Sequence, residues 1–203
     1  PQEAGLSPLT VTRDRESEAI VAQTLLGDVS REGENDVRHR YSSVQGTAEF
    51  SMNGTFSVRF QPGAWAKEHE RSYEDASQSC LERIDFQGTL ISSESGERPG
   101  QTVLTYYQNW EGTPLFSCQV TLLWQDDTLL RMEGQRLSGT ITSSSEEETL
   151  SAATVLVRFL AGVTEGGFVC SRIDEMNAGY LIVSGTTRPG ASPQTAAPIM
   201  WTP

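Results

Sequence analysis

Alternating apolar and polar residues between positions 102 and 137 constrain the fold of this chain more than any other feature. The segment reads "TVLTYYQNWEGTPLFSCQVTLLWQDDTLLRMEGQRL", with turn signals at Glu111-Gly112 and Asp126-Asp127. Successive side chains of a β-strand point to opposite faces, so this pattern is typical of strands that bury one face. We therefore predict a three-stranded antiparallel meander here.

A second group of strands is predicted between residues 37 and 60. Its dipeptide Asn53-Gly54 is the strongest short hairpin signal, and Phe56, Val58 and Phe60 alternate with polar residues beyond it. Two further strands are expected, "LTVT" at residues 9–12 and "TLISS" after Gly88. The sequence therefore contains many short strands joined by turns.

Helical spacing of apolar residues marks three further segments. The first, within residues 13–28, is expected to end at Gly27, and the second, within residues 72–86, to begin at the N-cap Ser72. A third is expected within residues 142–163, where a run of glutamates lies at the positive end of the helix. Helices thus precede groups of strands along the chain.

This order predicts an α+β fold made of two similar helix-plus-antiparallel-meander subdomains. The N-terminal helix-meander subdomain would cover residues 1–70. The C-terminal one, residues 71–203, would add the third helix and closing strands around residues 177–179. A shared pattern, Gly-Thr-x-x-Phe-Ser, begins at Gly46 and again at Gly112. We interpret it as duplicated architecture, with the phenylalanine of each copy pointing into the core.

The charge of the chain excludes two classes of partner. With 15 basic and 27 acidic residues its formal net charge is −12, which repels nucleic-acid phosphates and anionic lipid headgroups. No stretch reaches the ~20 apolar residues of a membrane span. The chain starts on a polar leader without methionine and ends abruptly at "PIMWTP", so we expect more chain on both sides in the natural protein.

The residues that could carry catalysis do not form a recognisable arrangement. Cys80, Cys118 and Cys170 lie far apart in apolar settings and are interpreted as buried thiols, and the only histidines are His39 and His69. A hydrolase would need one of these cysteines, or a serine, within reach of a histidine. Glycine-rich phosphate loops and metal-ligand clusters are absent from the sequence. We therefore expect no enzyme activity, no cofactor and no metal.

Aromatic residues gather in the predicted meander and offer the richest candidate surface. Because strand side chains alternate, about half of them must face the core, and the other half could form a platform for a partner. The candidate residues for this partner or ligand surface are Tyr107, Trp110 and Trp124. Core packing under a helix is the competing interpretation.

Four segments together resemble the extracytoplasmic part of YycI/YycH-type regulatory proteins of Gram-positive bacteria, which contain PepSY-like α+β units. These are Leu25-Leu26-Gly27, the segment 112–116 (Gly-Thr-Pro-Leu-Phe), Ile173–Tyr180 and Pro198–Trp201. The resemblance implies an outward-facing regulatory domain, anchored by an N-terminal transmembrane segment that this chain lacks. It further implies a protein partner in a two-component system, a membrane sensor kinase complex, and no direct membrane contact by this segment.

Two functions therefore remain in competition. The first is a non-enzymatic, extracytoplasmic regulatory or protein-interaction domain of a bacterial envelope protein. The second is a small-ligand or peptide-binding module of PepSY-like type, with its site between a meander and its helix near Tyr107 and Trp110. A pocket lined by those rings would favour the second.

Overall fold

The computed structural model describes residues 9–13, 16–32, 38–51, 54–137, 139–143, 177–183 and 194–201, together with Val157 and Ala161. It contains two helices in this part of the chain, α1 (Glu16–Leu26) and α2 (Tyr73–Glu82). The strands are β1 (Leu9–Arg13), β2 (Ser30–Glu32), β3 (Arg38–Ser43), β4 (Gly46–Ser51), β5 (Thr55–Phe60), β6 (Gly88–Ser95), β7 (Gln101–Trp110), β8 (Thr113–Gln125), β9 (Thr128–Gln135), β10 (Gly139–Ser143), β11 (Asn177–Val183) and β12 (Gln194–Trp201).

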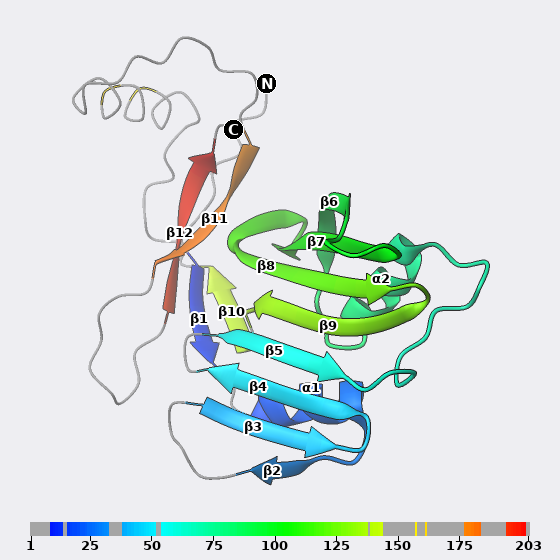
Figure 1. Cartoon of the computed structure of the whole chain (residues 1–203). Coiled ribbons are helices and arrows are strands. Elements are labelled where there is room, and N and C mark those ends of the chain that lie inside the picture. The colour runs from blue at the N-terminus through cyan, green and yellow to red at the C-terminus, as the bar shows by residue number, and fades with distance from the viewer. Residues whose placement is uncertain are drawn as a thin grey trace.

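All these strands belong to one twelve-stranded sheet, which forks at β8. Along one path the neighbours are β8, β9, β5, β4, β3 and β2, all antiparallel, while β7 and then β6 continue from the other edge of β8. Near its start β8 also pairs, in parallel, with β11, through Leu115 and Tyr180. Strands β12, β1 and β10 follow β11 (Figure 1).

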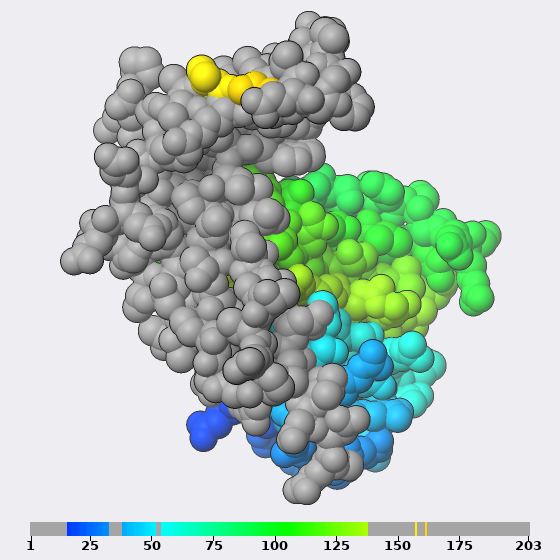
Figure 2. All heavy atoms as spheres, turned by 90° about the vertical axis from the view of Figure 1, so that its left-hand side faces the viewer, coloured from blue at the N-terminus to red at the C-terminus, as the bar shows by residue number. Residues whose placement is uncertain are grey.

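The predicted α+β fold of two similar subdomains is wrong, because the described chain is mainly β. Its two helices have only 11 and 10 residues, against a sheet of twelve strands. The last strands of the two meanders, β5 and β9, also pair with each other. Their register runs from Thr55 opposite Gln135 to Arg59 opposite Arg131. Figure 2 shows the first meander, blue and cyan, directly against the second, green. The division at residue 70 stays a prediction.

One hydrophobic core lies between the helices and one face of the sheet. It joins Leu25 of α1, Leu81 of α2 and strand residues of both meanders, including Val58 and Leu122, in a single cluster. In Figure 1 both helices lie behind the sheet, so the viewer looks at the face that they leave uncovered. Because the core is shared, neither meander packs as an isolated unit.

The local predictions for helices and turns are confirmed where the structure describes them. Gly27 follows α1 with φ +73°, and its N–H donates to Gln23 O at 2.8 Å, as expected of a helix C-cap. Ser72 Oγ caps α2 by accepting from Asp75 N at 3.0 Å. The meander of residues 102–137 is also present. The third helix, predicted within residues 142–163, falls on residues that, apart from Thr142 and Ser143 of β10 and the helical positions Val157 and Ala161, lie outside the described ones.

The two Gly-Thr-x-x-Phe-Ser copies do not hold equivalent positions. Gly46 lies within β4, where a Cβ would approach Arg59 O to 2.1 Å, whereas Gly112 forms the β7–β8 turn with open space around it. Phe50 is buried with 4% exposure, as predicted, but Phe116 is only partly buried and packs on Tyr107. The prediction for Phe116 is wrong because β8 bulges between Leu115 and Gln119, which moves this ring out of the alternation.

A buried polar cluster fixes α1 to the sheet and to the end of α2. His39 Nδ1 lies 2.8 Å from Glu18 Oε2, and both side chains are largely buried. Arg136 donates to Ser17 Oγ at 2.7 Å and to Ile84 O at 3.0 Å. Burial lowers the pKa of Arg136, and nearby carboxylates oppose that effect. These contacts hold together segments far apart in the sequence.

Gly134 is the backbone position on which the joined sheet most depends. It lies opposite Phe56 on β5 and Val120 on β8, with φ +150°. A Cβ there would stand 1.9 Å from Gln119 O and 2.8 Å from Val120 Cα. Both neighbours are backbone atoms of central strands, so they cannot move aside without disturbing the sheet.

We predict that Gly134→Ala lowers the free energy of unfolding by about 3 kcal/mol or more, because the methyl group forces β8 and β9 apart. Gly63→Ala is the matched control, since it has a similarly unusual φ of +83° but nothing within 4 Å of the new Cβ. It should cost only about 1 kcal/mol. Urea denaturation followed by circular dichroism measures both. Equal losses would show that the close approach at Gly134 is not the cause.

Candidate functional site

The uncovered face of the sheet presents an unbroken row of polar side chains. Along the strands, residues such as Val58, Met132 and Leu122 point into the core, so their immediate neighbours point to the opposite face. On this opposite face, one residue of each strand lies directly across from one residue of the next strand, all the way from β2 to β6. This polar row consists of Glu32, Arg40, Glu49, Ser57, Glu133, Thr121, Thr105 and Ser92.

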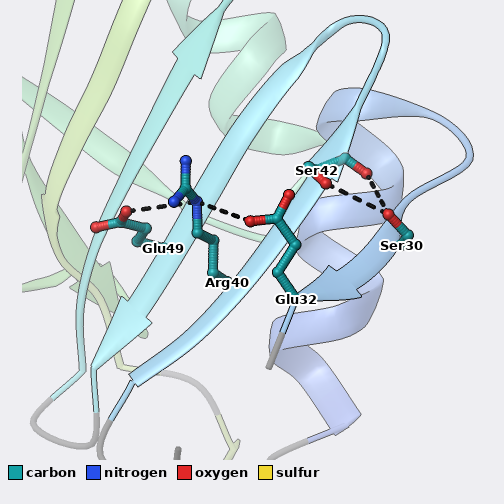
Figure 3. A network of polar contacts seen from close by, with 5 residues as sticks. All are labelled: Ser30, Glu32, Arg40, Ser42 and Glu49. Carbon is teal, nitrogen blue, oxygen red and sulfur yellow. Dashed lines mark hydrogen bonds and ion pairs between the residues drawn. The ribbon is translucent and has the colours of Figure 1, made fainter. Parts of the chain in front are cut away.

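At one end of the polar row, Arg40 lies between two carboxylates. Its Nε is 3.3 Å from Glu32 Oε2 on β2 and 3.7 Å from Glu49 Oε1 on β4 (Figure 3). Beside it, Ser30 Oγ lies 3.3 Å from Ser42 Oγ and 3.4 Å from the carbonyl oxygen of the same residue. The charged side chains are about half exposed, so these pairs contribute at most about 1 kcal/mol each and remain accessible to a partner.

The seam between the two meanders carries two arginines on this face. Arg59 on β5 and Arg131 on β9 are directly opposite each other. Arg131 contacts Glu133, two residues along the same strand, yet its Nε is buried without a hydrogen-bond partner. Like charges in directly opposite positions destabilise a sheet. The seam therefore has unused capacity for an anionic or hydrogen-bond-accepting group.

A shallow hollow of about 430 Å³ lies on the same face, where β8 leaves β9 at the fork. It exists because β8 bulges between Leu115 and Gln119 and because Gly134 has no side chain. The surface that lines it is mostly apolar and is formed by Thr55, Phe56, Ser117, Gln119, Glu133, Gly134 and Gln135. The hollow is wide open, so its shape suits a protruding side chain of a partner better than an enclosed small molecule.

Of the three aromatic residues predicted to form a surface, Trp124 belongs to the core. It is 1% exposed, and its Nε1 donates to the buried Ser77 Oγ of α2 at 2.9 Å. Its ring also packs on Tyr73, with centroids 5.9 Å apart. The prediction of a surface role for Trp124 is corrected by this burial: the helix that covers its strand could not be placed from the sequence.

Tyr107 and Trp110 are partly buried on β7 and do not form one platform. They are three residues apart on a strand that has no bulge of its own, so they point to opposite faces of the sheet. Tyr107 lies on the uncovered face with Phe116, their ring centroids 5.4 Å apart. Neither ring lines the hollow described above.

The two described cysteines are poor nucleophiles. Burial raises the pKa of Cys80 and of Cys118 to about 12, and both are fully buried. Both histidines contact carboxylates and not these cysteines. His39 contacts Glu18, and the exposed His69 Nδ1 lies 3.5 Å from Asp127 Oδ2. Within the described ranges, no three His, Cys, Asp or Glu side chains are arranged to hold a metal ion. Cys80 and Cys118 therefore give no support to a cysteine-based hydrolase.

We predict that Cys80 and Cys118 resist iodoacetamide in the folded chain at about pH 8, because almost no thiolate forms at a pKa far above that pH and access is blocked. Both should react at least about 100-fold faster in guanidinium chloride. Peptide mapping by mass spectrometry measures each cysteine separately. Rapid native modification of Cys118 would show instead that the fork opens to solvent.

The polar face could have been predicted from alternating residues in the sequence, although the aromatic residues were the more conspicuous feature. Polar residues alternate with apolar ones in "TFSVRF", as do Arg131 and Glu133 in "LLRMEG", and such alternation places the polar side chains on one face. What the sequence did not contain was the register, which sets Arg59 against Arg131 and Ser57 against Glu133.

Comparisons with known proteins do not assign the chain to a family. No family model matches it, and no curated protein matches it. Among solved structures it is similar to the C-terminal domain of Bacillus megaterium YpeB, with 14% sequence identity, a TM-score of 0.41, and coverage of 86% of this chain and 83% of that one. This likeness concerns the fold at most, and we base no functional argument on it. No described helix is both long and apolar enough to cross a membrane.

Proposed function

We propose that this chain is a non-enzymatic protein-interaction domain that binds its partner on the uncovered face of the sheet. The observation that carries the proposal is the seam of β5 and β9, where the solvent-accessible arginines Arg59 and Arg131 lie directly opposite each other. A carboxylate of a partner laid across the seam accepts hydrogen bonds from the exposed guanidinium nitrogens and relieves the repulsion between the two groups.

The dimensions of the face support the same proposal. Strands β2 to β9 form a broad, continuous surface, and the polar row crosses it from one outer strand to the other. All of its side chains are at least partly exposed, and apolar ones such as Val103 and Leu123 lie among them. A mixed surface of this kind is typical of interfaces between proteins that also exist apart.

The finer proposal concerns the setting of this domain. We propose that it is extracytoplasmic, belongs to an anchored regulatory protein, and acts on a membrane sensor kinase complex. The support is the resemblance of Leu25-Leu26-Gly27 and the segments quoted with it to YycI/YycH-type proteins. The interaction face is proposed independently of that resemblance.

The ligand-binding alternative now depends on the hollow and not on the aromatic rings. Gln119, Glu133 and Gln135 offer amide and carboxylate groups to a peptide or small polar molecule there. Its openness favours the protein-interaction proposal. Native mass spectrometry of the purified chain tests the alternative, since a bound small molecule would appear as a discrete added mass.

We predict that a photoreactive p-benzoylphenylalanine in place of Gln119, which is exposed on the face, forms a discrete protein adduct in the natural host. The same residue in place of Glu82, exposed on α2 on the other side of the sheet, should form none. Adducts of equal yield from both positions, or none from Gln119, would contradict the interaction face. Peptides of a sensor kinase in the adduct support the finer proposal, and another protein overturns only that part.

We further predict that Arg59→Glu reduces the Gln119 adduct at least about tenfold, because truncating a charge that faces a partner's carboxylate commonly costs more than 1.4 kcal/mol. Arg98→Glu is the matched control. It makes the same change of charge at an exposed position in the β6–β7 turn. An equal loss with both variants would mean that net charge, and not the seam, governs binding.

A further inference from the structure

Strand β6 is an outer strand of the sheet as far as the described residues go. It pairs with β7 on one edge, from Gly88 opposite Gln108 to Ser95 opposite Thr102, and no other described strand pairs with it. Six of its eight residues are exposed. The backbone N–H and C=O groups on its free edge therefore face solvent and can accept another strand.

This edge is also apolar at its centre. Leu90 is 39% exposed and Ile91 43%, which places both among the few large apolar side chains that the described residues expose. Ile91 is the extra residue of a bulge, since Leu90 opposes Tyr106 and Ser92 already opposes Thr105. Ile91 thus has no residue opposite it within the chain.

The opposite outer strand of this part of the sheet is built differently. Strand β2 has only three residues, Ser30, Arg31 and Glu32, all of them exposed. Short length and charge are the usual means by which proteins keep an edge from pairing. Between Gly88 and Ser93, β6 has neither: its sequence "GTLISS" contains no charged residue and no proline.

We propose that β6 is a self-association surface, on which β6 of a second copy pairs antiparallel about a two-fold axis. Two identical edges related in this way present matching donors and acceptors automatically. With the axis at the Leu90–Ile91 step, pairing spans Gly88–Ser93 on both copies and buries their four exposed apolar side chains together. Glu94 lies beyond the paired stretch, so no like charges oppose each other.

We infer that the strand which pairs with β6 comes from a second copy of this chain. The stretch Gly88–Ser93 is complementary to itself when it pairs antiparallel, and it is uncharged within a strongly acidic chain. A partner strand with a basic sequence would find no carboxylate between Gly88 and Ser93 to select it. Two-fold pairing consumes the β6 edge of each copy, so this contact closes at a dimer. This dimer does not depend on the interaction face proposed above.

Sedimentation equilibrium of the purified chain tests the proposal. A single strand pair is a small interface, so we expect a monomer–dimer equilibrium with a dissociation constant of about 1–100 µM. Ile91→Lys should raise that constant at least about tenfold, because two ammonium groups meet near the axis. Val44→Lys, at a side chain 94% exposed in the β3–β4 turn, is the matched control and should leave it unchanged.

Crosslinking gives a second readout that does not rely on disrupting the strand. In the proposed pairing, Ser92→Cys places the two new thiols near the axis, within about 10 Å of each other. A bismaleimide of that reach should yield covalent dimers, whereas the unaltered chain and Val44→Cys should not. A monomer at all concentrations up to about 500 µM, or dimers from Val44→Cys in equal yield, would overturn the proposal.

Discussion

The antiparallel pairing of β5 with β9 is the contact on which the rest of this structure depends. Each of these strands ends a meander, and without the pairing each meander would expose a long unpaired edge. The pairing also closes one core beneath both helices. On the other side of β9, Gly134 permits the close pairing with β8, because any larger residue would collide with the β8 backbone.

The same seam gives the uncovered face its chemical character. Because cross-strand neighbours share a face, the register that joins β5 to β9 sets Arg59 against Arg131 and Ser57 against Glu133. Like charges directly opposite each other destabilise a sheet, and we propose that a carboxylate of a partner offsets this cost. The bulge of β8 adds the hollow beside the seam. The register of β5 with β9 and the bulge of β8 therefore also shape the proposed interaction site.

The two proposed surfaces are compatible in one assembly. A two-fold axis that relates neighbouring antiparallel strands runs perpendicular to the sheet, so pairing through β6 leaves both uncovered faces on the same side. The dimer would present two copies of the polar row on one face of a continuous sheet, and the rows would meet at the paired β6 strands. Such an arrangement allows bivalent binding to a partner that is itself dimeric, with the gain in apparent affinity that linked sites confer.

The local elements could be predicted from the residues alone. Alternation indicated the meander of residues 102–137, Ser72 and Gly27 indicated the helix ends, and apolar surroundings marked Cys80 and Cys118 as buried. The fold class, the burial of Trp124, the position of Phe116 and the pairing of Arg59 with Arg131 instead depend on tertiary packing. The reason is physical: capping and alternation act between residues close in the chain, whereas strand order and register depend on which distant edges meet.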